Sequence, residues 1–205
     1  MLVKNIRHMK PSGEYIIKNV KCSDNGSTKL QITFDWPVGV QDVYIFASHL
    51  ASDNFDIHQA AGKIFTLQEY KKLGGFETSK MPGRTFYYIY PFVRCAEEGD
   101  ILHNQDGTNF TEFCEITKIK CLMREKNGIG ASKNFEITLS ANYPVGSDII
   151  CYVKKKNEIP TNINDGTLYQ FGAPLEPGQD VTRVVRTARN EYIRLFAKGE
   201  FYGIV

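Results

Sequence analysis

Apolar and polar residues alternate from Leu30 to Trp36, LQITFDW. Successive side chains of a β-strand point to opposite faces, so this period of two predicts a strand with one buried face. The alternation ends at the turn residues Pro37-Val38-Gly39, and the apolar run 43–47 follows. We therefore expect two consecutive strands joined by a short turn.

The same pattern recurs in the second half of the chain as Phe135–Tyr152, FEITLSANYPVGSDIICY. Pro144-Val145-Gly146 again separates an alternating strand from an apolar one. Trp36 and Tyr143 close the first strand of each copy, so we expect both as equivalent core residues. The segment YIIKNVKC (15–22) is likewise echoed by CEITKIKC (114–121). The shared order and spacing predict an internal duplication of one β unit.

A polar stretch centred on Asp106-Gly107, NQDGTNFTE at 104–112, is the best candidate for a linker between the copies. It predicts two β-sandwich domains, residues 1–108 and 109–205. The alternative is one larger sandwich in which strands of one half complete the sheets of the other. This alternative stays open because residues 48–83 have no regular period.

Further elements of the first copy follow from local signals. An apolar run predicts a strand at 14–22, and the aromatic run TFYYIYPFVRC predicts another at 85–95. Pro91 lacks a backbone N–H and therefore argues for an edge position or a bulge in that strand. Thr66 and Glu69 have the spacing of a capping box and Gly74 that of a C-cap, which together predict a short helix over 67–73.

The paired strands of the first copy resemble the second and third strands of fibronectin type III domains. In that family an alternating strand ends in Trp near a proline, as Trp36-Pro37 does here, and the next strand carries a Tyr, as Tyr44 does. The run Tyr87-Tyr88-Ile89 leading to Arg94 resembles the sixth strand of the family. The second copy departs from the pattern, with Tyr143 in place of the Trp. The resemblance implies two tandem immunoglobulin-like β-sandwiches and names no ligand.

Composition and charge fit a globular chain. Of the 205 residues, 42% are hydrophobic and 23% are charged, and the formal net charge is +2. So small a charge gives no argument for a nucleic-acid or membrane partner. The start, MLVKNIRHMKPSGEY, lacks the apolar core of a secretory signal, and no apolar run is long enough to span a membrane. The five cysteines are odd in number and form no Cys-x-x-Cys pair, so we expect free thiols and a cytoplasmic location.

Catalytic motifs are absent from the sequence. The four histidines (His8, His49, His58 and His103) share no metal-binding spacing, and neither a nucleophile elbow nor a phosphate-binding glycine loop occurs. The acidic pair Asp53 and Asp56, or the run Glu97-Glu98-Gly99-Asp100, has oxygens for weak calcium binding, but we expect a solvated loop at either position. We therefore predict no enzyme activity, no cofactor and no metal.

Two basic groups in the second copy are candidates for partner binding. Lys154-Lys155-Lys156 continues an apolar strand, where lysines bind an anionic partner or simply protect an exposed edge. The second group is Arg183, Arg186, Arg189 and Tyr192. Strand alternation would divide these positions between two faces.

These observations lead to one prediction and two alternatives. We expect a non-enzymatic binding or adaptor protein that acts through protein–protein interaction. A carbohydrate-binding accessory module is the first alternative, because such sites stack sugars on exposed aromatic rings, but the fold is expected to bury Trp36. A hydrolase with its site between the copies, or a site in the loop 48–62, is the second.

Overall fold

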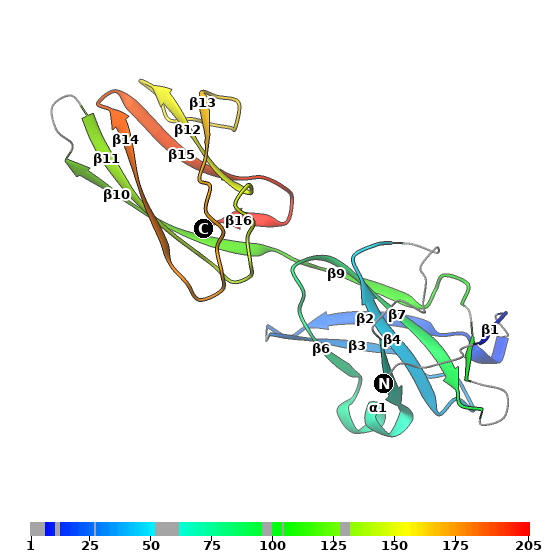
Figure 1. The fold of residues 1–205 in the computed structure, drawn as a ribbon. Helices are drawn as coiled ribbons and strands as arrows, with labels where there is room; N and C mark the ends of the chain where they lie inside the picture. Colours follow the sequence, from blue (N-terminus) through cyan, green and yellow to red (C-terminus); the bar gives the residue numbers. More distant parts are fainter. Residues whose placement is uncertain are drawn as a thin grey trace. The chain divides into compact units, whose positions relative to one another are not determined.

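The computed structural model describes residues 7–10, 13–26, 28–51, 62–95, 100–103, 105–127 and 132–205. The chain divides into two compact units, Met1–Glu115 (unit 1) and Ile116–Val205 (unit 2). Strands dominate both units (Figure 1), so the predicted all-β class is confirmed. Among the described residues, no helix is long and apolar enough to cross a membrane.

Unit 1 contains nine strands, one α-helix and a 3₁₀ turn within its described residues. They are β1 (Arg7–Met9), the turn Gly13–Tyr15, β2 (Lys18–Asp24), β3 (Lys29–Asp35), β4 (Asp42–Ser48), β5 (Lys63–Thr66), α1 (Leu67–Leu73), β6 (Phe76–Ser79), β7 (Gly83–Val93), β8 (Ile101–His103) and β9 (Phe110–Glu115). One sheet has the order β2-β3-β6. The other has the order β1-β8-β7-β4-β5, and β9 also pairs with β7.

Unit 2 consists of seven strands in the part that the structure describes. They are β10 (Thr117–Asn127), β11 (Ser132–Ala141), β12 (Ile150–Lys156), β13 (Thr167–Gln170), β14 (Val181–Ala188), β15 (Glu191–Ala197) and β16 (Tyr202–Ile204). One sheet has the order β14-β11-β10-β16 and the other the order β13-β12-β15. All of these pairs are antiparallel except β10 with β16.

The two units contain the same strand pairings in the same order along the chain. The array β2-β3-β6 of unit 1 corresponds to β10-β11-β14 of unit 2, and β5-β4-β7 corresponds to β13-β12-β15. The alternating strands of the sequence, β3 and β11, are central in the first array. The apolar strands that follow them, β4 and β12, are central in the second. Each copy of the sequence pattern therefore supplies the central strand of both three-strand arrays of its unit.

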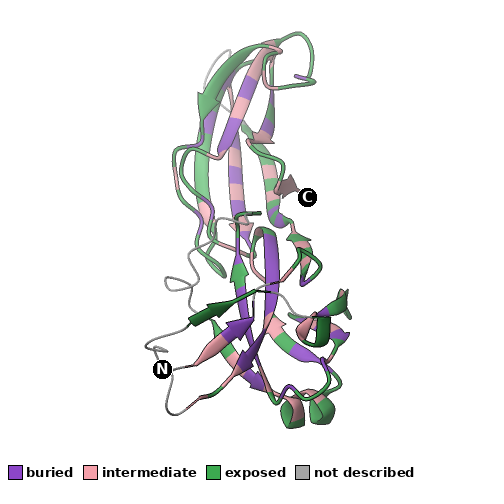
Figure 2. Cartoon of the chain, turned by 90° about the vertical axis from the view of Figure 1, so that its right-hand side faces the viewer, coloured by how far each residue is buried: buried purple, intermediate pink, exposed green. Residues whose placement is uncertain are grey.

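Each unit encloses an apolar cluster to which both of its sheets contribute. Ile32 of β3 and Ile45 of β4 belong to the cluster of unit 1. Ile137 of β11 and Ile150 of β12 belong to that of unit 2. Buried residues alternate with intermediate or exposed ones along most of β3 and β11, as the period of two requires, and such banding is visible along several strands in Figure 2. Unit 1 has a second buried cluster on the other face of its larger sheet, which includes Tyr44, Phe46, Phe86, Tyr88, Phe92 and Leu102.

The predicted helix is confirmed with its caps. Thr66 Oγ1 accepts the N–H of Glu69 at 3.1 Å, and the Glu69 carboxylate accepts the N–H of Thr66 at 2.9 Å. Gly74 adopts the left-handed conformation that ends the helix, with a φ of 71°. Local hydrogen bonds define both ends of this element, and they are therefore readable from the sequence.

Three elements differ from the sequence prediction. The expected strand 14–22 begins only at Lys18, because the 3₁₀ turn precedes it and the pairing with β3 shifts register between Lys18 and Lys21. The aromatic strand β7 is central rather than an edge, and Pro91 lies between the segments that pair with β9 and with β8. Pro91 has no backbone N–H to donate, and neither β8 nor β9 pairs with β7 at this residue.

The third difference concerns the expected linker at 104–112. Asn109 is buried, its side chain donates to the Ile89 carbonyl at 2.9 Å, and β9 begins at the next residue. Gln105 accepts the N–H of Ile17 at 2.8 Å. This polar segment therefore holds strands of unit 1 together, and the boundary between the units lies after Glu115.

Candidate functional site

The basic residues predicted for partner binding lie on several surfaces of unit 2. The register places Lys154 opposite the buried Ile193, so its side chain points between the two sheets, where its ammonium donates to the Arg186 carbonyl at 2.6 Å. Arg183 lies opposite Ile137 and stacks over Phe171. Arg186 is on the opposite face of β14 and is exposed.

Lys155 and Tyr192 lie opposite one another on the outer face of the sheet β13-β12-β15. The Lys155 ammonium contacts Asp165 at 2.8 Å and Glu158 at 2.5 Å. The hydrogen bond from Lys155, followed by those from the N–H and hydroxyl of Thr161, lowers the pKa of Asp165 to about 2. These contacts fasten the segment 157–166 to β12, so Lys155 has a structural partner already.

The remaining predicted residues lie at strand ends. Lys156 ends β12, and Arg189 is in the turn between β14 and β15; both are exposed. The Lys133 ammonium forms a cation–π contact with Tyr192, 5.0 Å from the centroid of its ring. The seven residues therefore do not form one contiguous patch, because strand alternation separates them.

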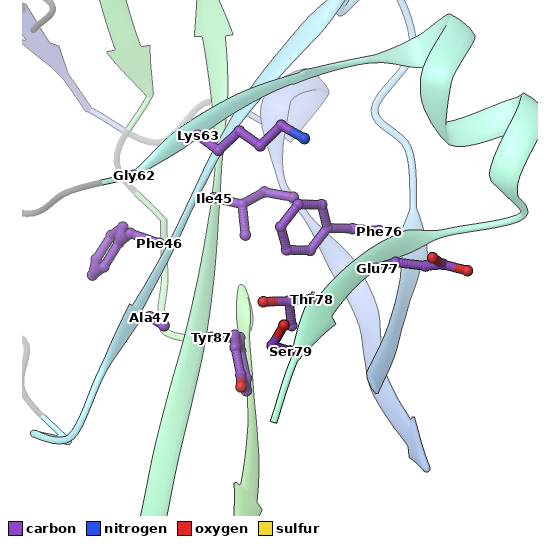
Figure 3. A pocket seen from close by; sticks show the side chains of 10 residues that line it. All are labelled: Ile45, Phe46, Ala47, Gly62, Lys63, Phe76, Glu77, Thr78, Ser79 and Tyr87. Carbon is purple, nitrogen blue, oxygen red and sulfur yellow. The ribbon is translucent and has the colours of Figure 1, made fainter. Parts of the chain in front are cut away.

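A pocket of about 450 Å³ opens in unit 1 between its two sheets. Figure 3 shows its lining, which comes from β4, the start of β5, β6 and β7: Ile45, Phe46, Ala47, Gly62, Lys63, Phe76, Glu77, Thr78, Ser79 and Tyr87. Ile45, Phe76 and Tyr87 belong to the buried apolar cluster between the sheets. The floor of the pocket is thus the core of the unit itself.

The pocket forms because the strand β5 is short. Its four residues pair with β4 only from Asp42 to Ile45. Beyond that point β4 continues to Ser48, paired with β7 alone among the described strands. Ala47 lies opposite the buried Tyr87 but is exposed, in a strand whose other residues are mostly buried. The core is open to solvent at this residue.

Polar groups occupy the rim of the pocket. The Lys63 ammonium lies 5.9 Å from the centroid of the Phe76 ring, above the pocket (Figure 3). Thr78 lies opposite the buried Leu30, so its side chain points inward, whereas Glu77 points outward and pairs with Lys29 at 3.3 Å. The site therefore offers an apolar floor, an inward hydroxyl and one cation, a composition suited to binding rather than to acid–base chemistry.

β6 forms the other wall and is an edge strand. It pairs with β3, and the structure shows no further strand beside it among the residues described. One wall of the pocket, residues 76–79 of β6, therefore has a strand edge with which no described strand pairs. An unpaired edge presents backbone donors and acceptors to an incoming chain.

Two of the histidines considered for metal or catalytic chemistry, His103 and His49, make structural contacts. His103 is buried, stacks on Tyr15 at 4.1 Å, and burial lowers its pKa. His49 Nδ1 is 2.9 Å from the Arg84 carbonyl oxygen. The structure contains no group of three or more potential metal ligands among the residues it describes. Asp53, Asp56, His58, Glu97, Glu98 and most of the loop 48–62 lie outside those residues.

Trp36 and Tyr143 are both only partly buried. Trp36 packs against the cluster of unit 1, stacks on Phe34 at 5.5 Å, and donates its indole N–H to the Val40 carbonyl at 2.9 Å. Tyr143 is not a member of the buried cluster of unit 2. The expected equivalence as core residues is therefore incorrect for Tyr143, and Trp36 closes the edge of its cluster rather than filling its centre.

Sequence reasoning did not find the pocket. It lies between the start of β5 and the strand β6, which are separated in the sequence by the helix α1. One weak sign of the pocket was present in the sequence: Ala47 is a small residue at an inward position of a strand whose other inward residues are large. Alternation predicts Ala47 as a core residue, yet its side chain is exposed, because among the described strands β5 pairs with β4 only up to Ile45.

No family model matches the chain, and no curated protein matches it. Among solved structures, the chain is similar to the chitinase ChiA74 from Bacillus thuringiensis, with 13% identity and a TM-score of 0.27. The match covers 87% of this chain, which spans 28% of the chitinase. A match to the receptor tyrosine kinase Torso has 8% identity and a TM-score of 0.27, and covers 89% of this chain and 73% of the other.

Proposed function

We propose that this is a non-enzymatic binding protein that acts through protein–protein contacts, and that the pocket of unit 1 holds an apolar side chain of an extended partner segment. One observation supports the proposal above all. The pocket has core residues as its floor, and one of its walls is the edge strand β6, beside which no further strand lies among the described residues. Its volume is in the range of ligand sites, about 300–1,000 Å³.

An extended segment fits this site better than a folded surface does. Strand addition supplies backbone hydrogen bonds from the edge, and every second side chain of the added strand then points inward. Beside β6, one such side chain would enter the pocket and contact Ile45, Phe76 and Tyr87. Burying a large apolar side chain contributes about 1.5–3 kcal/mol, so this residue would anchor the segment.

The fold proposal is that each unit is an immunoglobulin-like β-sandwich of the fibronectin type III kind, produced by duplication. The identical order of strand pairing in both units supports it, together with the repeated Pro-Val-Gly turns. Such domains commonly serve as interaction modules, which agrees with a binding function.

The carbohydrate-binding alternative has less support. It requires a flat, exposed aromatic platform, and the single Trp of the chain is engaged by two rings and a backbone carbonyl. The apolar floor of the pocket also offers few partners for sugar hydroxyls.

Selection from a displayed library of random peptides, on the intact chain, tests the proposed function. Ala47→Trp fills the pocket mouth, and Val38→Trp, in an exposed turn of the same unit, adds the same side chain elsewhere. Peptides enriched on the wild-type chain should bind Val38→Trp normally and lose binding to Ala47→Trp. Enriched peptides that bind all three proteins equally would refute the pocket as the site.

A reducing, cytoplasmic location is also proposed. All five cysteines are free thiols in the structure, and burial raises the pKa of Cys22, Cys121 and Cys151, which keeps these thiols protonated. Thiol counting on denatured, unreduced protein should give five, whereas one or three would indicate an oxidising compartment.

A further inference from the structure

The strand β10 carries a row of cations on its outer face. Ile119 belongs to the core cluster of unit 2, and Cys121 and Met123 pack against it. The alternate positions point outward and are exposed, and four of these five are basic: Lys118, Lys120, Leu122, Arg124 and Lys126. Residues two apart on one strand are about 6.8 Å apart, so the charges form a regular line.

The neighbouring strand β14 adds a cation to this surface, and β11 contributes one carboxylate. Arg186 of β14 lies in register with Asn134, which lies opposite Lys126, so Arg186 joins the same face. Glu136 pairs with Lys126 and is the one carboxylate among the described residues that point outward from this sheet. We call the surface of Lys118, Lys120, Arg124, Lys126 and Arg186 the basic face.

The whole-unit charge agrees with this arrangement. Residues 116–205 contain 13 basic and nine acidic residues, a net of +4, while residues 1–115 contain 12 and 14, a net of −2. Solvent-facing sheets normally intersperse both signs, because like charges in a row repel one another. The repulsion within this row of cations disfavours the folded state of the free protein, and an anionic partner would relieve it.

Two exposed apolar side chains lie within the basic face. Leu122, in the middle of the row, is 50% exposed, and Val184 of β14 is 63% exposed. An extended peptide has the same repeat of about 6.8 Å between alternate side chains. Its carboxylates would meet the cations of β10 one for one, with an apolar residue opposite Leu122.

We propose that the basic face of unit 2 binds an extended acidic segment of a partner protein, in which acidic residues alternate with neutral ones around one apolar residue. The inference gives a partner chemistry to the binding protein proposed above. The residues of the basic face differ from those of the pocket in unit 1, so an experiment can refute either proposal without refuting the other.

The test uses the intact chain and two synthetic nonapeptides of identical composition. The matching peptide is Glu-Thr-Glu-Thr-Leu-Thr-Glu-Thr-Glu, and the clustered control is Glu-Glu-Thr-Thr-Leu-Thr-Thr-Glu-Glu. At about 50 mM salt, where screening is weaker than at physiological strength, fluorescence anisotropy should show clearly tighter binding of the matching peptide. The triple variant Lys118→Gln/Lys120→Gln/Arg124→Gln should bind it about tenfold more weakly, as expected for the loss of three exposed charge contacts.

A second triple variant, Lys156→Gln/Arg189→Gln/Lys198→Gln, removes the same charge from unit 2 outside the basic face. It should retain most of the affinity, and so should Ala47→Trp, which tests independence from the pocket. Amide spectra of both triple variants should match the wild-type protein, because the substituted side chains are on the surface. No binding of the matching peptide, equal affinity for the two peptides, or equal losses in both triple variants would overturn the proposal.

Discussion

Units 1 and 2 share their strand pairing but differ in the faces that this pairing leaves outside. The outer face of the larger sheet in unit 1 carries buried aromatic residues, among them Tyr44, Phe46 and Tyr88. The outer face of β10 in unit 2 carries lysines and arginines in solvent. The difference teaches that backbone pairing and inward positions specify the architecture, while outward positions are free to acquire separate surface properties.

A second difference lies between the two sheets of each unit. In unit 1 the short β5 and the helix α1 leave the core exposed at Ala47. In unit 2 the side chain of Lys154 spans from β12 to the backbone of β14. One unit therefore has a pocket where the other has a cation between its sheets.

The comparison assumes that each unit folds without the other. Expressing the units as separate fragments tests this assumption, and it is the change with the largest expected effect on folding. A fragment 1–115 retains β9, which pairs with six residues of β7, whereas 1–108 loses it together with the buried Asn109. We expect dispersed amide spectra from 1–115 and from 116–205. Fragment 1–108 should be largely unfolded. Equally well-dispersed spectra from 1–108 and 1–115 would show that β9 is dispensable.

Truncating the matched core isoleucines tests the independence of the units. Ile32 and Ile137 are fully buried in corresponding strands, so either change to Ala should cost about 2–5 kcal/mol of unfolding free energy. Trp36 is the only tryptophan, and its fluorescence reports unit 1 alone. Ile32→Ala should lower the denaturation midpoint seen by Trp36, and Ile137→Ala should leave it in place. A shift of similar size in both would mean that the units unfold as one.

Two glycines that precede edge strands sharpen the comparison. Gly75, before β6, and Gly166, before β13, have φ of 152° and 147°, and an added Cβ would meet the carbonyl oxygens of Ile32 and Lys154 respectively. Substitution by Ala should cost about 1–3 kcal/mol at each. The cost should be larger for Gly166, where the overlap is closer. Chemical denaturation of both variants measures this, and a neutral Gly166→Ala would contradict the strand geometry.

The smallest expected effect is the pH dependence of stability that comes from Asp165. The pKa of Asp165 is lowered to about 2 by Lys155 and Thr161. A lowered pKa means that the folded state favours the carboxylate, so this contribution to stability is present above pH 4 and is lost as pH falls towards 2. NMR titration should show a midpoint near pH 2 that rises in Lys155→Gln. An unchanged midpoint would remove the anchoring role of Lys155.

Sequence reasoning predicted the features that depend on local pattern. Alternation identified β3 and β11, and the capping residues Thr66 and Glu69 identified α1. It failed where distant segments decide the outcome. The polar segment that ends at Asn109 looked like a linker, yet its side chains bond to strands far away in the sequence.

The sequence by itself determined which side of β3 and of β11 faces the core, because a period of two leaves no freedom once one face is apolar and the other is polar. It also determined the line of cations on β10, since alternation placed them together. The tertiary structure alone decided which of the described strands lie at sheet edges, where the core opens at Ala47, and that β9 belongs to unit 1. These features depend on pairing between residues far apart in the chain, and no local pattern of side chains encodes which partner an edge will meet.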